Sequence, residues 1–389
     1  MPDTILHDLV SRGAACPDLP SLLALLGALL EARGLGVDRM NLSLATLHPE
    51  IVGIGVYWDR ERGQGKADLP HGELQTPRFL ESPLPRVMGC GESIVRALDP
   101  ADPKPEFSIF RELAARGFVA YAALPLALAP GRTGAFTVAS RRPFGPDLLS
   151  TLDGLLPGLA LLVELHESRR FSATLLDTYL GHGPGQRVLN GAVRRGDVTG
   201  LKAALWYADL RGFTEAALHL SPEQTIAHIN AAFEVMVGRV EPAGGDVLKF
   251  IGDALLAVFP IEDDGEGAAQ RALDAAVQVQ HDLAALSQHR IEAGLPAIAA
   301  GIALHAGDVQ YGNIGGKRRL DFTVIGQAVN LVSRIEGQCA ALAQPILASR
   351  AFVDLAPGDW RSVGEHPLKG FPGRFGLFAP GAARPVENL

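Results

Sequence analysis

The sequence predicts an α+β protein made of two successive domains, and three observations support this prediction. The chain has 389 residues, more than one ordinary compact domain contains. Its first part follows the order helix, two strands, long loop, short helix, two strands and long helix, which is typical of an antiparallel sheet flanked by helices. Its second part follows the order β-α-β-β-α-β, which favours a split βαβ sandwich.

The elements of the first part can be placed along the chain. Asp18 is a favourable N-cap for a helix over 18–33. Alternating or β-rich residues predict paired strands, and Gly, Pro and polar residues predict turns and irregular segments. We expect strands over 40–44, 51–58, 118–128 and 134–140, turns at 48–50 and 129–132, a helix over 107–116 and an irregular segment over 60–106.

A long helix is predicted from Pro146 to about Tyr179. It carries two apolar stripes, Leu155, Leu159 and Leu162 followed by Phe171, Leu175 and Tyr179, which either pair two chains or pack on their own domains. We expect Gly181–Gly185 to end the helix and Arg194–Asp197 to form a solvated linker. The domain boundary is therefore expected near residue 197.

The second part matches a ferredoxin-like, split βαβ arrangement. Ser221 before Pro222 is a good N-cap with proline at the first helical position. The expected elements are a strand over 201–209, a helix over 222–240, a hairpin over 244–259, a helix over 266–287, a strand over 297–305, a hairpin over 309–325 and a helix over 327–342, with short strands over 344–347 and 374–378.

Composition limits the kinds of partner. The net charge is -8 and a fifth of the residues are charged, which argues against nucleic acid and gives no polybasic membrane signal. Cys16, Cys90 and Cys339 are widely spaced and odd in number, and no two of them have the spacing of metal ligands, which suggests a reducing compartment without a disulfide framework. The N-terminus lacks a secretory apolar region, and the apolar run 155–165 is short and contains Pro157. We expect a cytoplasmic protein that binds no nucleic acid or membrane.

Two carboxylates follow apolar strands, Asp209 directly and Asp253 within the hairpin. If adjacent strands carry them, they converge on one edge of the sheet, where paired carboxylates suit Mg²⁺ and leave positions open for phosphates. Gly212 would let the backbone N–H groups of Phe213 and Thr214 approach such phosphates. The structural alternatives are that Asp209 caps the next turn and that Asp253 forms an ion pair with Lys249.

Four motifs of the second part, in this order and spacing, resemble those of class III nucleotidyl cyclases over about residues 198–380. They are Asp209–Thr214, Lys249–Asp253, Gly312–Gly315 and Phe322–Arg334. The resemblance implies two metal ions, Mg²⁺ or Mn²⁺, at Asp209, Leu210 and Asp253, with phosphate contacts from Phe213 and Thr214. It also implies that Asn330 orients the ribose, that Arg334 stabilises charge on the α-phosphate and that Lys369 binds phosphate.

Base choice in this resemblance depends on Lys249 and Thr323. A lysine donates to adenine N1, whereas guanine presents a donor there. The pair therefore favours ATP, and it is similar to the class IIIb branch, which makes bicarbonate a candidate regulator. The implied reaction converts ATP to cyclic AMP and pyrophosphate in a homodimer with shared sites; the alternatives are a guanylate cyclase and a catalytically silent nucleotide-binding regulator.

The first part resembles a GAF-type sensor domain over residues 18–168. The resemblance rests on Tyr121–Leu126, Thr137–Ala139 and Phe144–Leu149. It implies a regulatory domain over 1–168 for an unidentified small ligand, a helical linker over 169–197 and a catalytic domain over 198–380.

His305 and the glycine-rich segment Gly312–Gly316 have structural interpretations, since neither has the neighbours of a metal site or a P-loop.

Overall fold

The computed structural model describes residues 2–46, 51–128, 132–261, 265–317 and 319–381. It divides into two compact units, Met1–Ser172 and Ala173–Leu389. Both combine helices with sheets that are largely antiparallel, so the predicted α+β class is confirmed. The turns expected at 48–50 and 129–132 lie wholly or mostly outside the described residues.

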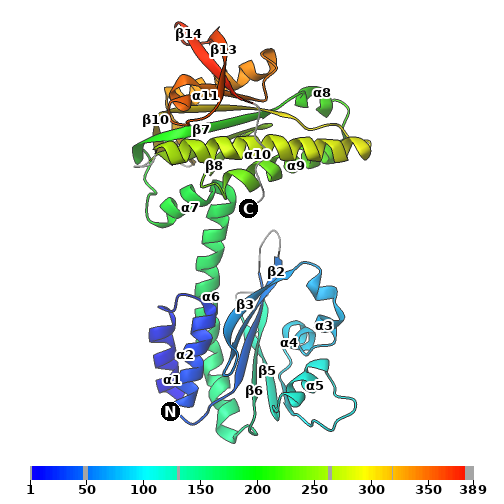
Figure 1. The fold of residues 1–389 in the computed structure, drawn as a ribbon. Coiled ribbons are helices and arrows are strands. Elements are labelled where there is room, and N and C mark those ends of the chain that lie inside the picture. The colour runs from blue at the N-terminus through cyan, green and yellow to red at the C-terminus, as the bar shows by residue number, and fades with distance from the viewer. Residues whose placement is uncertain (1, 47–50, 129–131, 262–264, 318, 382–389) are drawn as a thin grey trace. The chain divides into compact units, whose positions relative to one another are not determined.

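The N-terminal unit contains a six-stranded sheet in the order β3-β2-β1-β6-β5-β4. Its strands are β1 Arg39–Ala45, β2 Ile51–Asp59, β3 Gly63–Pro70, β4 Ile94–Ala97, β5 Ala120–Ala127 and β6 Thr133–Ser140. Its helices are α1 Pro2–Gly13, α2 Leu19–Glu31, the 3₁₀ helix η1 Glu73–Gln75, α3 Pro77–Leu80, α4 Leu84–Cys90, α5 Ser108–Ala115 and α6 Pro146–Leu180. Helices α1, α2 and α6 cover one face of the sheet, and α3, α4 and α5 cover the other (Figure 1).

Sequence periodicity explains the first of these faces. In β1 the even residues Met40, Leu42 and Leu44 are buried against the α1, α2 and α6 side, while the odd residues face α3–α5. Asp18 caps α2 by accepting from Ser21 N–H at 2.8 Å, as predicted. The expectation of an irregular segment over 60–106 is wrong, because β3, η1, α3, α4 and β4 lie there. The edge strand β3 is mostly exposed and polar, and the other four elements are too short for a clear periodic signal.

Helix α6 crosses the boundary between the two units in the sequence. By length and composition alone it is a candidate membrane span, and half of its apolar window is buried in the structure. Its stripe of Leu155, Leu159 and Leu162 packs into the core of the N-terminal unit, whereas Leu175 and Tyr179 are exposed. The helix ends at Leu180 as expected, but Gly183–Gly185 belong to a further helix, α7 His182–Leu189.

The C-terminal unit contains an eight-stranded sheet whose main path is β13-β14-β12-β10-β7-β9-β8, with β11 paired to β10. The strands are β7 Val198–Leu210, β8 Asp246–Ile251, β9 Ala254–Ile261, β10 Ala300–Gly315, β11 Leu320–Ile325, β12 Ile346–Ser349, β13 Trp360–Pro367 and β14 Arg374–Pro380. The remaining helices are α8 Phe213–Ala217, α9 Pro222–Val240, α10 Gly265–Glu292, α11 Gln327–Ala341 and α12 Arg350–Val353. The central order β10-β7-β9-β8 is that of the predicted split βαβ arrangement.

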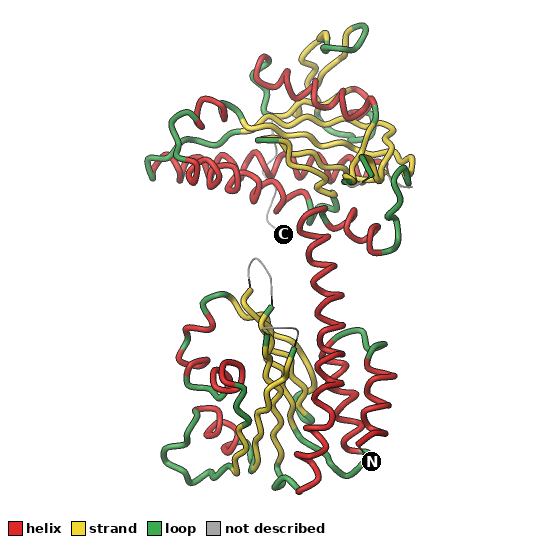
Figure 2. The backbone as a smooth tube through the Cα atoms, turned by 180° about the vertical axis from the view of Figure 1, so that it is seen from behind, coloured by secondary structure: helices red, strands yellow, loops and turns green. Residues whose placement is uncertain are grey.

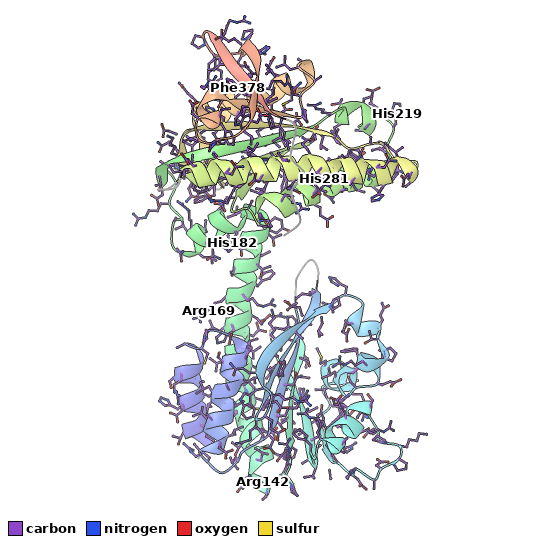
Figure 3. The ribbon with its side chains drawn as sticks, viewed as in Figure 1. Arg142, Arg169, His182, His219, His281 and Phe378 are labelled. Atoms are coloured by element: carbon purple, nitrogen blue, oxygen red, sulfur yellow. The ribbon has the colours of Figure 1, made fainter. Side chains whose placement is uncertain are left out.

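Helices lie on both faces of the C-terminal sheet (Figure 2). Helices α9 and α10 pack on the face that contains Trp206 and Phe259, and α11 packs on the opposite face. Phe378 belongs to β14, next to the edge strand β13 (Figure 3), and the Arg350 guanidinium lies 4.0 Å from its ring centre. Ser221 forms the predicted cap of α9, as a complete capping box with Gln224.

Two expectations for this unit differ from the structure. The strand expected over 297–305 and the first arm of the hairpin expected over 309–325 form one continuous strand, β10, because its glycines pair with β7 and β11 instead of forming a turn. The segment Arg194–Asp197 is exposed, but Gly196 N–H donates to Asn313 O, which ties this linker to β10.

Candidate active site

Asp209 and Asp253 are neighbours at one end of the C-terminal sheet. Asp209 is the penultimate residue of β7, and it lies opposite Ala254 at the start of β9. Asp253 directly precedes Ala254, in a turn that Gly252 enters with a φ of 65°. The sheet register therefore brings the two carboxyl groups together, as the sequence predicts.

The environment of this pair fits a divalent cation. Burial, followed by the charge of Asp253 and a hydrogen bond with it, raises the pKa of Asp209 to about 6. Asp209 Oδ1 is buried and has no hydrogen-bond partner in the described part of the chain. Two adjoining carboxyl groups with an unpaired buried oxygen are a donor set that Mg²⁺ or Mn²⁺ accepts. Leu210 contributes a backbone hydrogen bond to the Asp209 carboxylate, and its side chain packs into the core.

A third carboxyl group, Glu336 of α11, approaches this pair. Burial and the charge of Asp209 raise the pKa of Glu336 to about 7. Gly301 lies opposite Asp209 in the sheet, and a Cβ there would come within 2.5 Å of Glu336 Oε1. The residues described include no cluster of three or more His, Cys, Asp or Glu that could hold a metal ion. Glu336 is therefore not counted as a third metal ligand beside Asp209 and Asp253.

Lys249 lies on the same sheet face as Asp209. Leu256 of β9 pairs with Lys249 of β8 and with Tyr207 of β7, and paired residues face the same side of a sheet. Asp209 is two residues after Tyr207 on β7, so it faces that side too. Lys249 forms an ion pair with Asp321 of β11. In the described residues no hydrogen bond or ion pair joins Lys249 to Asp253, so the ion pair offered as the structural alternative within the hairpin is wrong.

Thr323 and Asp321 are two residues apart on β11, so their side chains face the same side of this strand. Thr323 is 9% exposed, in contrast to Lys249 and Asp321, which are 36% and 46% exposed. Lys249, Asp321 and Thr323 therefore form a second group, which we call the β8/β11 group. Its ion pair connects residues far apart in the sequence.

The remaining predicted residues lie at the surface or pack locally. Asn330 and Arg334 are exposed and are four residues apart on α11. Phe213 packs beside the buried His228 with ring centres 6.2 Å apart, and Thr214 is exposed next to it. Lys369 is exposed in the turn between β13 and β14.

The side chains that the sequence analysis did not identify are Asp321 and Glu336. Asp321 comes two residues before Thr323, and Glu336 two residues after Arg334. A search for charged residues flanking the motifs would have found both, although the sequence gives no sign that Asp321 pairs with Lys249.

His305 and the glycines of β10 have structural roles. The His305 ring is buried, its Nδ1 lies 2.7 Å from Ser349 Oγ, and burial lowers its pKa to about 4. A Cβ on Gly312 would lie 2.1 Å from the Asp197 carbonyl oxygen, so this glycine permits close strand packing. The region Gly312–Gly315 belongs to β10 and is not a separate turn.

Comparison with known proteins agrees with this site. Residues 201–357 match the family model of the adenylate and guanylate cyclase catalytic domain. The chain is similar to an adenylate cyclase of Anabaena cylindrica, 37% identical over 35% of this chain and 27% of that protein, and to adenylate cyclase 1 of Rhizobium meliloti, 30% identical over 38% and 22%. It therefore spans about a quarter of the length of these relatives.

A solved structure of a bacterial light-regulated adenylyl cyclase shares the fold. It has a TM-score of 0.51 at 17% identity and covers 69% of this chain and 88% of that one. The match to the family model and the shared fold both make the segment 201–357 similar to catalytic domains of adenylate and guanylate cyclases.

Proposed function

We propose that this chain is an adenylate cyclase that converts ATP to 3′,5′-cyclic AMP and pyrophosphate. The observation that carries the proposal is the half-buried Asp209–Asp253 pair, whose Asp209 Oδ1 is buried without a partner in the described residues, inside a segment that matches the cyclase catalytic family. Two relatives that match part of the chain are named adenylate cyclases.

Asp209 and Asp253, with the adjoining backbone of Leu210, would hold two Mg²⁺ or Mn²⁺ ions. When bound, such ions make the ribose 3′-hydroxyl more acidic and neutralise the triphosphate. Arg334 would bind the α-phosphate through its planar guanidinium while Asn330 orients the ribose. The 3′-oxygen then forms a bond to the α-phosphorus as the bond to the pyrophosphate oxygen breaks.

The phosphate chain would have further contacts from this chain. The backbone N–H groups of Phe213 and Thr214 follow Gly212, whose φ of 66° turns the chain at the end of β7. Lys369 is an exposed ammonium group that suits a terminal phosphate.

The β8/β11 group would read the base. Lys249 would donate to adenine N1, and the Thr323 hydroxyl would accept from the adenine amino group. Asp321 forms an ion pair with Lys249. A hydroxyl also donates, so guanine is the second candidate base, and the guanylate cyclase alternative depends on this position.

The active form would be a homodimer in which the metal pair of one chain faces the base-reading group of the other. The support is the apolar surface near these residues: Phe250, Ile251 and Ile325 are 52%, 46% and 49% exposed. Co-expression of Asp209→Ala with Arg334→Ala tests the arrangement, because each homodimer would be inactive and the mixed dimer would regain one complete site. Absence of rescue would contradict shared sites.

The proposal also covers the domain organisation, the location and the regulation of the enzyme. Residues 1–168 would be a GAF-like regulatory domain, 169–197 a linker and 198–380 the catalytic domain of a cytoplasmic enzyme, with bicarbonate as a candidate regulator. Mass detection of the product formed from an ATP–GTP mixture with Mg²⁺ or Mn²⁺ tests the activity and the base together. Cyclic AMP is the expected product; cyclic GMP would establish the guanylate alternative, and no cyclic product would favour a silent nucleotide-binding regulator.

A further inference from the structure

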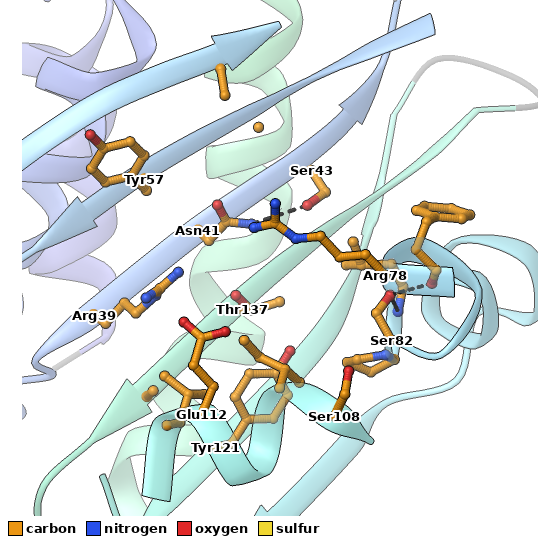
Figure 4. Close-up of a pocket in the computed structure, with 18 of the residues that line it drawn as sticks. Arg39, Asn41, Ser43, Tyr57, Arg78, Ser82, Ser108, Glu112, Tyr121 and Thr137 are labelled. Atoms are coloured by element: carbon orange, nitrogen blue, oxygen red, sulfur yellow. Dashed lines mark hydrogen bonds between the residues drawn. The ribbon is translucent and has the colours of Figure 1, made fainter. Parts of the chain in front are cut away.

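The N-terminal unit contains a cavity of about 600 Å³ between its sheet and the segments that cover it. The floor is formed by β1, β2 and β6, and the walls by residues of α3, α4 and α5 (Figure 4). Cavities of this volume hold small organic ligands. Gly55 of β2 lines the floor, and a Cβ built there would meet nothing within 4 Å, so the space above it is open.

The floor of this cavity is polar although it is covered. Ser43 of β1 and Thr137 of β6 are only 6% and 8% exposed, and Asn41 donates through Nδ2 to Ser43 Oγ at 3.0 Å. A polar group loses its hydration when it is buried, and this costs free energy that an apolar side chain at the same position would not lose. Thr137 and Tyr121 are hydrogen-bonded to each other, so an occupant would meet the remaining donor and acceptor positions of these hydroxyl and amide groups.

The cavity also contains arginines without partners. Arg39 of β1 and Arg78 of α3 extend toward it (Figure 4), and neither side chain forms a hydrogen bond or ion pair with the residues that the structure describes. Burial lowers the pKa of Arg39, so its charge is held at a cost. Arg62 also lines the cavity; it is exposed, and it forms no ion pair with the residues that the structure describes.

The acidic residues of the cavity do not cancel these charges. Asp59 is 3% exposed and is bonded to Arg116 at 2.6 Å and to the N–H groups of Glu61 and Arg62. Glu112 faces Arg39 without a hydrogen bond to it (Figure 4), and Glu73 also lines the cavity. If the ion pair of Asp59 with Arg116 is counted as neutral, three arginines of the lining stand against two carboxylates, so the cavity together with this ion pair has one excess positive charge.

We propose that this cavity binds a small organic anion whose carboxylate or phosphate group pairs with Arg39 and Arg78, while Asn41, Ser43 and Thr137 hydrogen-bond its polar body. Planar guanidinium groups bind both kinds of oxyanion bidentately. The site is independent of the catalytic residues, because every residue that lines it belongs to the N-terminal unit.

Calorimetric titration of the full chain tests this site with two anions, succinate for a carboxylate and glycerol 3-phosphate for a phosphate. Succinamide and glycerol serve as matched neutral probes at constant ionic strength. We expect at least one anion to bind, its Kd to rise at least tenfold in Arg39→Met and Arg78→Met, and binding to be retained in Arg142→Gln. Arg142 is an exposed arginine of the same unit outside the cavity (Figure 3).

Binding of one anion alone identifies the acid class and supports the site. Two results would overturn the proposed site. One is that the anions bind no better than their neutral analogues at about 10 mM, well above an ordinary metabolite Kd. The other is unchanged anion binding in both arginine variants. Thermal unfolding without ligand gives an independent measurement. An unpaired cation should make Arg39→Met more stable than the wild type, whereas a structural ion pair would make it less stable.

Discussion

The sheets of the two units share one design and differ in their second face. Each sheet buries one apolar face under long helices. In the N-terminal unit the face with Asn41 and Ser43 is covered by α3–α5 and encloses a cavity, whereas in the C-terminal unit the face with Asp209 and Lys249 carries α11 and keeps Lys249 36% exposed. A covered polar face suits a small ligand, and an open one suits a nucleotide and a second protein surface.

The two faces also share an energetic feature. Arg39 in the first and Asp209 in the second are each partly buried without a complete set of partners, and the pKa of each is shifted towards the neutral form. Such groups reduce the stability of the unliganded protein and are retained where a ligand neutralises them. The following predictions test this comparison, from the largest expected effect to the smallest.

Replacing Asp209 by Asn should have the largest effect. We expect cyclic nucleotide formation to fall about 1,000-fold, equivalent to about 4 kcal/mol of transition-state stabilisation. In the absence of divalent cations the midpoint of unfolding should rise, because Asn removes a carboxylate whose charge is opposed by burial and by Asp253. Steady-state assays and thermal unfolding measure the two effects, with the exposed Asp308→Asn as control. A loss of both activity and stability would show that Asp209 is structural.

His305 should make the C-terminal unit sensitive to acid. Its pKa is about 4 in the folded protein and 6.5 in the unfolded chain. Because the unfolded state binds the proton more tightly, stability is complete above pH 6.5 and falls as the pH decreases towards 4. Between pH 7 and pH 5 the free energy of unfolding should fall by about 2 kcal/mol.

Denaturant titrations of wild type and His305→Gln at both pH values measure this effect. Gln retains a polar partner for Ser349 and does not titrate. An equal pH dependence in the two proteins would assign the acid sensitivity to other groups.

Matched glycine substitutions compare the packing of the two faces. A Cβ on Gly301 would lie 2.9 Å from Cys339 Cβ and 2.5 Å from Glu336 Oε1, whereas a Cβ on Gly55 meets nothing within 4 Å. We expect Gly301→Ala to lower the free energy of unfolding by about 1–2 kcal/mol. Gly55→Ala should change it by less than about 0.5 kcal/mol. Equal effects in equilibrium unfolding would mean that the cavity above Gly55 is filled.

Asp321→Asn should have the smallest effect. It removes an exposed ion pair, which contributes up to about 1 kcal/mol, and leaves Lys249 free to adopt other rotamers. The KM for ATP should therefore rise up to about fivefold with little change in kcat, and discrimination against GTP should weaken. Kinetics with both nucleotides measure this, with Asp308→Asn as control; a fall in kcat at constant KM would place Asp321 in the chemical step instead.

Much of the C-terminal unit could be predicted from the sequence. The hairpin around Gly252, the capped helix α9 and the helix that carries Asn330 and Arg334 have strong local signals in turn residues, caps and periodicity. The continuity of β10 could not be predicted, because its glycines resemble turn residues until β7 and β11 pair with them. The elements η1, α3 and α4 between β3 and β4 could not be predicted either, because each is too short to show a period.

By itself the sequence determined the order of the elements and which residues carry charge at strand ends, because periodicity and spacing act over a few residues. Tertiary structure alone decided the partner of Lys249, since Asp321 lies 72 residues further along the chain. Tertiary structure also decided whether the polar residues of β1 face solvent or line a cavity. Alternation shows that Asn41 and Ser43 share a face, but only the packing of α3–α5 turns that face from a solvated surface into the lining of a cavity.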